Sequence, residues 1–252
     1  MILIAGPCVV ENYDTTFKIA SFLKNLTGDM GIDFLFKASY DKANRTSINS
    51  FRGHPDAVGI LNYIKERIDI RLTSDVHSTL EVPMAKRVLD VIQIPALLCR
   101  QTDLVTAVAK TGLPINIKKG QFMSPADMRN VVEKVRSVGD NEVMLIERGT
   151  TFGYNNLVVD MRSIPIMQGT GCKVIFDATH SVQYPGGGNS SGGDRSFVPT
   201  LAKAAVAAGA DGVFIECHPD PDNALCDGPN SMYLEDMPDL IADLVKIHTC
   251  LN

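Results

Sequence analysis

Residues of the types that bind metal ions stand where short apolar runs of the chain end. Cys8 follows the first run, His180 follows the seventh, Glu216 lies in the eighth, and Asp227 lies beyond it. One thiolate, one imidazole and two carboxylates suit a divalent ion such as Zn2+, Fe2+, Mn2+ or Cd2+. Each residue belongs to a different segment, so the spacing of the residues along the chain does not by itself establish a metal site. A buried Cys8 that packs as a small apolar residue is the alternative.

Basic residues at comparable positions form a second chemical group, which comprises Lys37, Lys42, Arg45, Arg100, Lys118 and Arg148. Their combined charge exceeds what one phosphate requires, and it predicts two phosphorylated substrates, one of which is also a carboxylate. A solvated surface lysine is the alternative for any single member. Lys118 and Arg148 are the strongest candidates because they stand at the ends of apolar runs. His77 and His218 have similar positions and are further candidate metal ligands.

Eight short apolar runs carry these residues, at 2–5, 34–38, 70–74, 91–96, 115–118, 143–147, 174–178 and 213–217. Amphipathic stretches separate them, at 16–27, 80–89, 103–110, 125–138, 198–208 and 237–249 among others. Ser124 before Pro125 is a typical helix start. This alternation predicts parallel strands joined by right-handed helical crossovers.

Eight such units in 252 residues predict an α/β protein with one domain over residues 1–252, a (β/α)8 TIM barrel. A doubly wound open sheet is the alternative, but no GxGxxG follows the first run. In a barrel the carboxyl ends of the strands form one face, where the metal-binding and basic residues would meet. The Gly-rich segment 184–195 would follow the seventh strand there, either as a solvated spacer or as a mobile lid.

Composition limits the partners of the chain. Lys and Arg number 24 and Asp and Glu number 29, and the net charge of −5 argues against nucleic acid or an anionic membrane. The six cysteines form no CxxC pair, the N-terminus has no basic leader, and no apolar run could span a bilayer. We therefore expect a soluble cytoplasmic protein with reduced thiols, which binds small phosphorylated molecules.

Nine short motifs resemble the 3-deoxy-D-manno-octulosonate 8-phosphate (KDO8P) synthases from residue 2 to about residue 235. They are GPC (6–8), KANRTS (42–47), SDVH (74–77), QIPA (93–96), CRQTD (99–103), NIKK (116–119), ERGTTFGY (147–154), DATH (177–180) and CDGP (226–229). KANRTS is the most discriminating, because the related synthases that use erythrose 4-phosphate typically carry KPRTS there. The resemblance implies condensation of phosphoenolpyruvate with D-arabinose 5-phosphate, a step in lipopolysaccharide biosynthesis.

The resemblance also implies roles for individual residues. Lys118 and Arg148 would hold phosphoenolpyruvate, with Lys42 and Gln93 nearby and Lys37 beneath. Arabinose 5-phosphate would lie over Asn44, Arg45, Thr46 and Ser47, and Asp75 would contact a sugar hydroxyl. Similar enzymes are homotetramers in which an arginine matching Arg100 reaches the sugar phosphate of a neighbouring subunit.

Position 8 separates two forms of this family. Metal-free members have Asn where this chain has Cys8, so the resemblance implies the metal-dependent form with Cys8, His180, Glu216 and Asp227 as ligands. The segment 226–230, however, is closer to the metal-free version. Which ion is used, whether it is required, and whether it orients the aldehyde or activates water stay open. Cys226 is interpreted as a packing residue, with a competing thiol ligand as the alternative.

Three other functions remain as alternatives. The first is the erythrose 4-phosphate synthase of the aromatic pathway, against which KANRTS argues. The second is a Schiff-base aldolase with Lys118 or Lys37 as its nucleophile, for which the metal set would be superfluous. The third is a phosphosugar sensor without turnover, although no catalytic position of the resemblance is lost.

Overall fold

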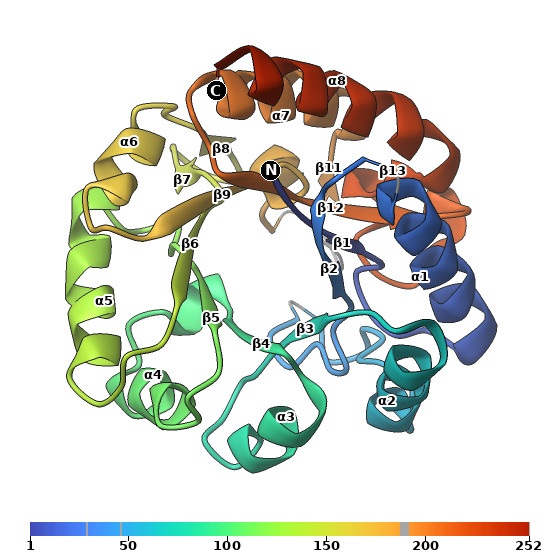
Figure 1. Cartoon of the computed structure of the whole chain (residues 1–252), viewed down its shortest axis with the longest axis horizontal. Coiled ribbons are helices and arrows are strands. Elements are labelled where there is room, and N and C mark those ends of the chain that lie inside the picture. Colours follow the sequence, from blue (N-terminus) through green and yellow to red (C-terminus); the bar gives the residue numbers. More distant parts are fainter. Residues whose placement is uncertain (29, 46, 187–191, 252) are drawn as a thin grey trace.

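The computed structural model describes residues 1–28, 30–45, 47–186 and 192–251. Figure 1 looks down a closed ring of parallel strands, and β1 completes the ring by pairing with β12 from Ile2 opposite Gly212 to Gly6 opposite Glu216. The ring strands are β1 (Ile2–Gly6), β2 (Asp33–Lys37), β3 (Leu72–Asp75), β4 (Val91–Ile94), β5 (Ile115–Lys118), β6 (Val143–Glu147), β9 (Lys173–Asp177) and β12 (Gly212–His218). The predicted (β/α)8 barrel is confirmed, with its eight strands within two residues of the expected bounds.

Helices surround the ring on its outside (Figure 1). They are α1 (Tyr13–Gly28), α2 (Ala57–Ile68), α3 (Val82–Val88), α4 (Thr102–Ala109), α5 (Met128–Arg136), α6 (Ser163–Gln168), α7 (Val198–Ala207) and α8 (Met237–Leu251). In α5 the buried residues are Met128, Val131, Val132 and Val135, a helical spacing that lays one apolar face on the barrel. Ser124 caps the preceding 3-10 turn, because its side chain accepts a hydrogen bond from the backbone N–H of Ala126. In the described part of the chain, no helix is both long and apolar enough to cross a bilayer.

Side chains that alternate in direction along the strands form two apolar layers, one inside the ring and one between the strands and the helices. One set of buried residues fills the inside of the ring, and it comprises Ile2, Ile4, Leu35, Val91, Met144, Ile146, Ile175 and Phe214. Their neighbours in sequence, such as Leu3, Phe36 and Val213, belong to the larger cluster between strands and helices. Successive strand side chains point to opposite faces, so the same alternation carries on toward the carboxyl ends of the strands.

At those ends the inward positions turn from apolar to polar. Two residues after Leu35 stands Lys37, two after Phe214 stands Glu216, and two after Ile175 stands Asp177, and all of these are buried. The inside of the barrel is therefore an apolar plug with a charged layer above it.

The remaining strands are short and lie in the loops at this end. β7 (Thr150–Thr151) pairs with β8 (Leu157–Val158), and β10 (Gln183–Tyr184) pairs with β11 (Gly192–Gly193). β13 (Met232–Tyr233) lies parallel to the end of β12. The hairpin of β10 and β11 brackets residues 187–191, which fall outside the described residues, so the choice between spacer and lid remains a prediction.

Candidate active site

A pocket of about 550 Å³ opens at the carboxyl ends of the strands. Among its lining residues are ten of the predicted site residues: Lys37, Lys42, Asn44, Arg45, Asp75, Gln93, Lys118, Arg148, His180 and Asp227. These come from seven different strand ends or the loops that follow them, as expected for this face of a barrel. The fold thus brings most of the predicted residues into one cavity.

Lys37 and Glu216 form an ion pair at the base of the pocket. The ammonium group of Lys37 donates hydrogen bonds to Oε1 of Glu216 at 2.6 Å and to the carbonyl oxygen of Cys8 at 2.8 Å. Burial acts to lower the pKa of Lys37, but the carboxylates of Glu216 and Asp75 outweigh it and the pKa is raised. Burial acts to raise the pKa of Glu216, but Lys37 and His180 outweigh it and the pKa is lowered. Both groups are therefore charged at neutral pH.

Lys118, Asp177 and His180 form a second buried cluster. The ammonium group of Lys118 donates to Oδ2 of Asp177 at 2.6 Å and lies 3.8 Å from the centre of the Phe214 ring. Nδ1 of His180 lies 2.9 Å from the same carboxylate oxygen, which fixes the imidazole and leaves its Nε2 directed elsewhere. Burial lowers the pKa of Lys118 in spite of Asp177. The neighbouring cations hold the pKa of Asp177 well below its usual range against the opposing effect of burial.

Arg148 brings a guanidinium group that is not fully paired. Its Nη2 donates to the carbonyl oxygen of His180 at 3.2 Å and to Oε1 of Gln183 at 3.0 Å. Its Nη1 is buried and has no hydrogen-bond partner among the described residues. A buried cationic donor without a partner is costly, so this nitrogen fits an anionic ligand in the pocket.

Lys42 and Asp75 complete the charged wall. Burial, together with the nearby charge of Lys37, lowers the pKa of Lys42 to about 8. Asp75 accepts a hydrogen bond from Ser39 at 2.5 Å, and its other oxygen lies 3.0 Å from Nε2 of His77. The hydrogen bond from His77 and the charge of Lys42 overcome the effect of burial and hold the pKa of Asp75 well below its usual range.

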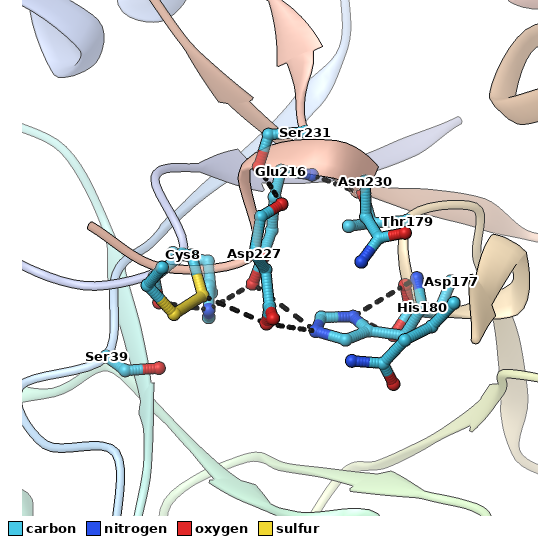
Figure 2. A network of polar contacts seen from close by, with 12 residues as sticks. Cys8, Ser39, Asp177, Thr179, His180, Glu216, Asp227, Asn230 and Ser231 are labelled. Atoms are coloured by element: carbon cyan, nitrogen blue, oxygen red, sulfur yellow. Dashed lines mark hydrogen bonds and ion pairs between the residues drawn. A yellow bond between two sulfur atoms is a disulfide. The ribbon is translucent and has the colours of Figure 1, made fainter. Parts of the chain in front are cut away.

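The four predicted metal ligands meet around Asp227 (Figure 2). Nε2 of His180 lies 3.7 Å from Oδ2 of Asp227 and 3.8 Å from Oε1 of Glu216, and these three residues form one group that could hold an ion. Sγ of Cys8 lies 3.3 Å from the same oxygen of Asp227, in a second such group with Cys226. Asp227 has φ of 48°, a left-handed conformation that Asp tolerates better than most residues.

Two observations indicate that this donor set fits a divalent cation. Oε2 of Glu216 is buried without a hydrogen-bond partner in the described structure, and a cation would satisfy it. The guanidinium group of Arg45 lies 3.1 Å from Oδ1 of Asp227 and 3.5 Å from Sγ of Cys8. These two ligands therefore already attract one positively charged group. The types of donor suit Zn2+, Fe2+, Mn2+ or Cd2+ better than Mg2+ or Ca2+.

Residues 1–249 match the DAHP synthetase I family. The chain belongs to this family. Among curated proteins it is similar to the 2-dehydro-3-deoxyphosphooctonate aldolase of Desulfosudis oleivorans, with 60% identity over 98% of this chain and 90% of that protein. Proteins of the same name from Syntrophobacter fumaroxidans and Geobacter sp. strain M21 are 57% and 56% identical, over 98% and 99% of this chain and 86% and 93% of theirs.

Some predicted residues of this family member lie away from the pocket. Arg100 is exposed and does not line it, and its carbonyl oxygen accepts a hydrogen bond from Lys134 at 2.8 Å. Ser47 accepts a hydrogen bond from the backbone of Asn49 at 3.2 Å and does not line the pocket either. Thr46 lies outside the described residues.

The two further histidines are not in either metal-binding group of the described chain. His77 lies beside Asp75, and Nε2 of His218 lies 3.5 Å from a carboxylate oxygen of Glu11. Each histidine has a carboxylate partner of its own, so both serve to hold neighbouring loops rather than to complete the metal group.

Sequence reasoning gave no role to three supporting residues, of which it named Asp177 alone. Asp177, which pairs with Lys118, stands at a strand end, and its inward direction could have been found from the alternation along β9. Ser39 and Gln183, the partners of Asp75 and Arg148, lie in loops where no periodic pattern identifies a direction. The thiols of Cys8 and Cys226 lie in contact, with their Cα atoms 6.1 Å apart, and the expectation that the thiols are reduced stays a prediction. These residues are 218 positions apart, and only the closed barrel brings them together.

Proposed function

We propose that this chain condenses phosphoenolpyruvate with D-arabinose 5-phosphate and water to give KDO8P and inorganic phosphate. The observation that carries the proposal is the buried cation cluster of Lys42, Lys118 and Arg148, whose Arg148 Nη1 has no partner among the described residues. The curated relatives at 56–60% identity carry the name of this enzyme, which supports the same reaction here. The product is a precursor of KDO in lipopolysaccharide.

Phosphoenolpyruvate carries a phosphate and a carboxylate, and the cations at the strand ends match both. We assign its binding to Lys118 and Arg148, because they are buried donors on the adjacent strand ends of β5 and β6. Gln93 lines the same cavity, and its side-chain NH2 group would donate a hydrogen bond to the bound anion. Lys37 lies beneath and is held by Glu216, so it contributes charge more than direct contact.

Arabinose 5-phosphate is assigned to the opposite side of the pocket. Asn44 and Arg45 line this side, and they belong to the KANRTS segment that the resemblance connects with the sugar phosphate, together with Thr46 and Ser47. Asp75 is anionic and lines the same cavity, so it can accept a hydrogen bond from a sugar hydroxyl.

The reaction then needs stabilisation of charge at two places. The C3 carbon of phosphoenolpyruvate forms a bond to the aldehyde carbon, which leaves cationic character at C2 and a negative oxygen on the former aldehyde. Lys42, with a pKa of about 8, can give its proton to that oxygen. Water adds at C2 and loses a proton, which can return to Lys42. The C2–O bond to phosphate then breaks as the C2 hydroxyl becomes the ketone, and the hydroxyl proton leaves with the phosphate. Lys118 and Arg148 hold the phosphate and carboxylate throughout and neutralise the dianionic leaving group.

We assign the divalent ion to Cys8, His180, Glu216 and Asp227. When bound, such an ion would act as a Lewis acid toward the aldehyde or toward water. The residues themselves prepare the site, because Asp177 orients the imidazole of His180 through Nδ1 and keeps Nε2 available as a ligand. His180 also lies 3.3 Å from the ammonium group of Lys118, which connects the ligand set to the substrate cradle.

Assembly and location extend the proposal. Arg100 is exposed between the 3-10 turn Ala96–Leu98 and α4, and in the homotetramer that the resemblance implies it would reach a neighbouring subunit. Sedimentation velocity of the purified protein tests the tetramer, and cell fractionation tests the cytoplasmic location.

The decisive experiment measures phosphate release from phosphoenolpyruvate with arabinose 5-phosphate, with erythrose 4-phosphate, and with no sugar. Turnover that requires arabinose 5-phosphate is expected, and mass spectrometry should identify the eight-carbon product. Faster turnover with erythrose 4-phosphate would overturn the proposal in favour of the aromatic-pathway reaction. Removing the metal with a strong chelator and adding back Mn2+, Zn2+ or Cd2+ tests the metal assignment in the same assay.

A further inference from the structure

Lys119 is the second lysine of the NIKK motif, and the proposed reaction gives it no role. Its side chain is 0% exposed and does not line the pocket. The preceding outward positions of β5 are Ile115 and Ile117, which pack in the apolar cluster between strands and helices. An apolar residue at position 119 would continue this pattern. A buried cation costs free energy that an apolar side chain of similar size does not, so packing alone does not explain the lysine.

The ammonium group of Lys119 donates hydrogen bonds to acceptors from two loops. Oγ1 of Thr150 lies at 3.1 Å and the carbonyl oxygen of Gly149 at 3.3 Å, and both residues follow β6. The carbonyl oxygens of Gly120 and Met123, which follow β5, each lie at 3.5 Å. Because β5 and β6 are neighbours in the ring (Figure 1), Lys119 joins the loops that leave their carboxyl ends.

These two loops carry side chains of the pocket. Gln121 and Arg148 both line it, and the carbonyl oxygen of Gln121 accepts a hydrogen bond from the backbone N–H of Thr151 at 3.0 Å. Lys119 contacts the backbone of both loops from the side of the strands that faces away from the pocket. It can therefore influence the pocket wall without meeting a ligand.

Arg148 lies between two residues that Lys119 contacts. Before it, Oε1 of Glu147 lies 3.4 Å from the ammonium group of Lys119, and after it comes the carbonyl group of Gly149 that Lys119 binds. The same carboxylate oxygen accepts a hydrogen bond from the backbone N–H of Gly149 at 2.6 Å. Gly149 has φ of 90°, a conformation that favours glycine. One buried charged pair thus holds the backbone on both sides of Arg148.

We propose that Lys119 is a positioning residue that sets the direction of the Arg148 side chain, an inference that rests on the proposed binding of phosphoenolpyruvate by Arg148. Lys119 itself touches no substrate. It fixes the turn from which the guanidinium group enters the pocket, where Nη1 is buried without a partner among the described residues. A misplacement of about 1 Å in a site of this kind can cost about 10²-fold in rate, so a rigid support for this donor matters.

The test measures the Kd of phosphoenolpyruvate on the full-length protein by isothermal titration calorimetry, and kcat/KM in the phosphate-release assay. Lys119→Met should raise the Kd and lower kcat/KM, each by roughly 10- to 100-fold, because the guanidinium group is no longer held in place. In an Arg148→Lys background the same change should cause little further loss, since the positioned group is already gone. A merely structural role would give the same loss in both backgrounds.

A second variant guards against a failure to fold. Lys119→Met leaves the carboxylate of Glu147 buried without its cation, which destabilises the protein. The double variant Lys119→Met/Glu147→Gln removes both charges and keeps an oxygen that can accept from the N–H of Gly149. Replacing a buried ion pair as a whole is often nearly neutral, so this protein should unfold near the wild-type temperature and still show the loss in phosphoenolpyruvate binding.

Lys65→Met is the matched control. Lys65 donates to Oδ1 of Asp90 at 2.8 Å and to the carbonyl oxygen of Val88 at 3.0 Å, and it does not line the pocket, so the variant should bind phosphoenolpyruvate like the wild type. The inference is wrong if both folded Lys119 variants bind phosphoenolpyruvate like the wild type, or if the loss is undiminished in the Arg148→Lys background. Wild-type protein that binds phosphoenolpyruvate but releases no phosphate would reject the proposed reaction alone, whereas wild-type protein that does not bind it would overturn both.

Discussion

The ammonium group of Lys37 lies 2.6 Å from Oε1 of Glu216, and the two side chains are 1% and 0% exposed. Glu216 also belongs to the group that could hold a divalent ion. The lysine therefore balances a carboxylate that otherwise would need the ion to compensate its charge. This pair connects the stability of the barrel to its proposed metal site.

Replacing Lys37 with Met should destabilise the metal-free protein by about 3–5 kcal/mol, because a buried carboxylate loses its partner. Urea unfolding in the presence of a chelator measures the change. Lys173→Met is the matched control, since Lys173 pairs with Glu142 at 2.8 Å with both side chains about half exposed. That change should cost no more than about 1 kcal/mol. Equal effects of the two variants would show that the buried pair does not have the role assigned to it.

The pH dependence of turnover should reflect Lys42. Its pKa is lowered to about 8, so the ammonium form is present below this pH and is lost as the pH rises through it. If Lys42 donates a proton to the aldehyde oxygen, kcat/KM should fall on the alkaline side of about pH 8. Lys42→Arg should lose most activity and move this alkaline limb upward, because a guanidinium group does not lose its proton in this range. Lys86→Arg, at an exposed position of α3, is the control. An unchanged limb in Lys42→Arg would assign the titration to another group.

Arg148→Lys should lower kcat/KM by about 10²–10³, the effect typical of losing one donor that stabilises a transition state. A lysine side chain keeps the positive charge but has no planar fork of N–H donors. It therefore cannot replace Nη1 of Arg148, the buried donor that has no partner among the described residues. Thermal unfolding should stay near the wild-type value. Arg162→Lys, in which an 84% exposed side chain is changed, serves as the control for the substitution type. Turnover near the wild-type level in Arg148→Lys would remove this residue from the phosphoenolpyruvate site.

The positions of the strands and the direction of many of their side chains could be predicted from the sequence, because successive side chains of a strand point to opposite faces of the sheet. Lys118 and Lys119 illustrate the reach of this pattern. Lys118 continues the inward positions of β5 and meets Asp177, whereas Lys119 points to the other side and lies 3.4 Å from Glu147. Counting in steps of two from the apolar residues of the strand is enough to assign these two lysines to opposite sides.

Contacts between loops could not be predicted in this way. The contact of Cys8 with Cys226 and the anchoring of Leu225 by Glu11 join segments more than two hundred residues apart. Loops have no periodic pattern, so their side-chain directions depend on where the closed barrel places their ends. The pattern of strand ends grouped Cys8 and Asp227 as candidate metal ligands, and the resemblance to a known family matched them to its ligands.

Cys8→Asn provides the test of whether the ion is essential. Asn occupies this position in the metal-free form that the resemblance describes, so we expect the reduced variant to lose tight metal binding while it keeps part of its activity. Metal content after dialysis and turnover with and without chelator measure the two effects separately. Cys250→Asn, remote from the pocket on α8, should keep both the metal and the chelator sensitivity of the wild type. A Cys8→Asn protein that binds the ion at full stoichiometry but is inactive would show that Cys8 acts in the reaction rather than as a ligand.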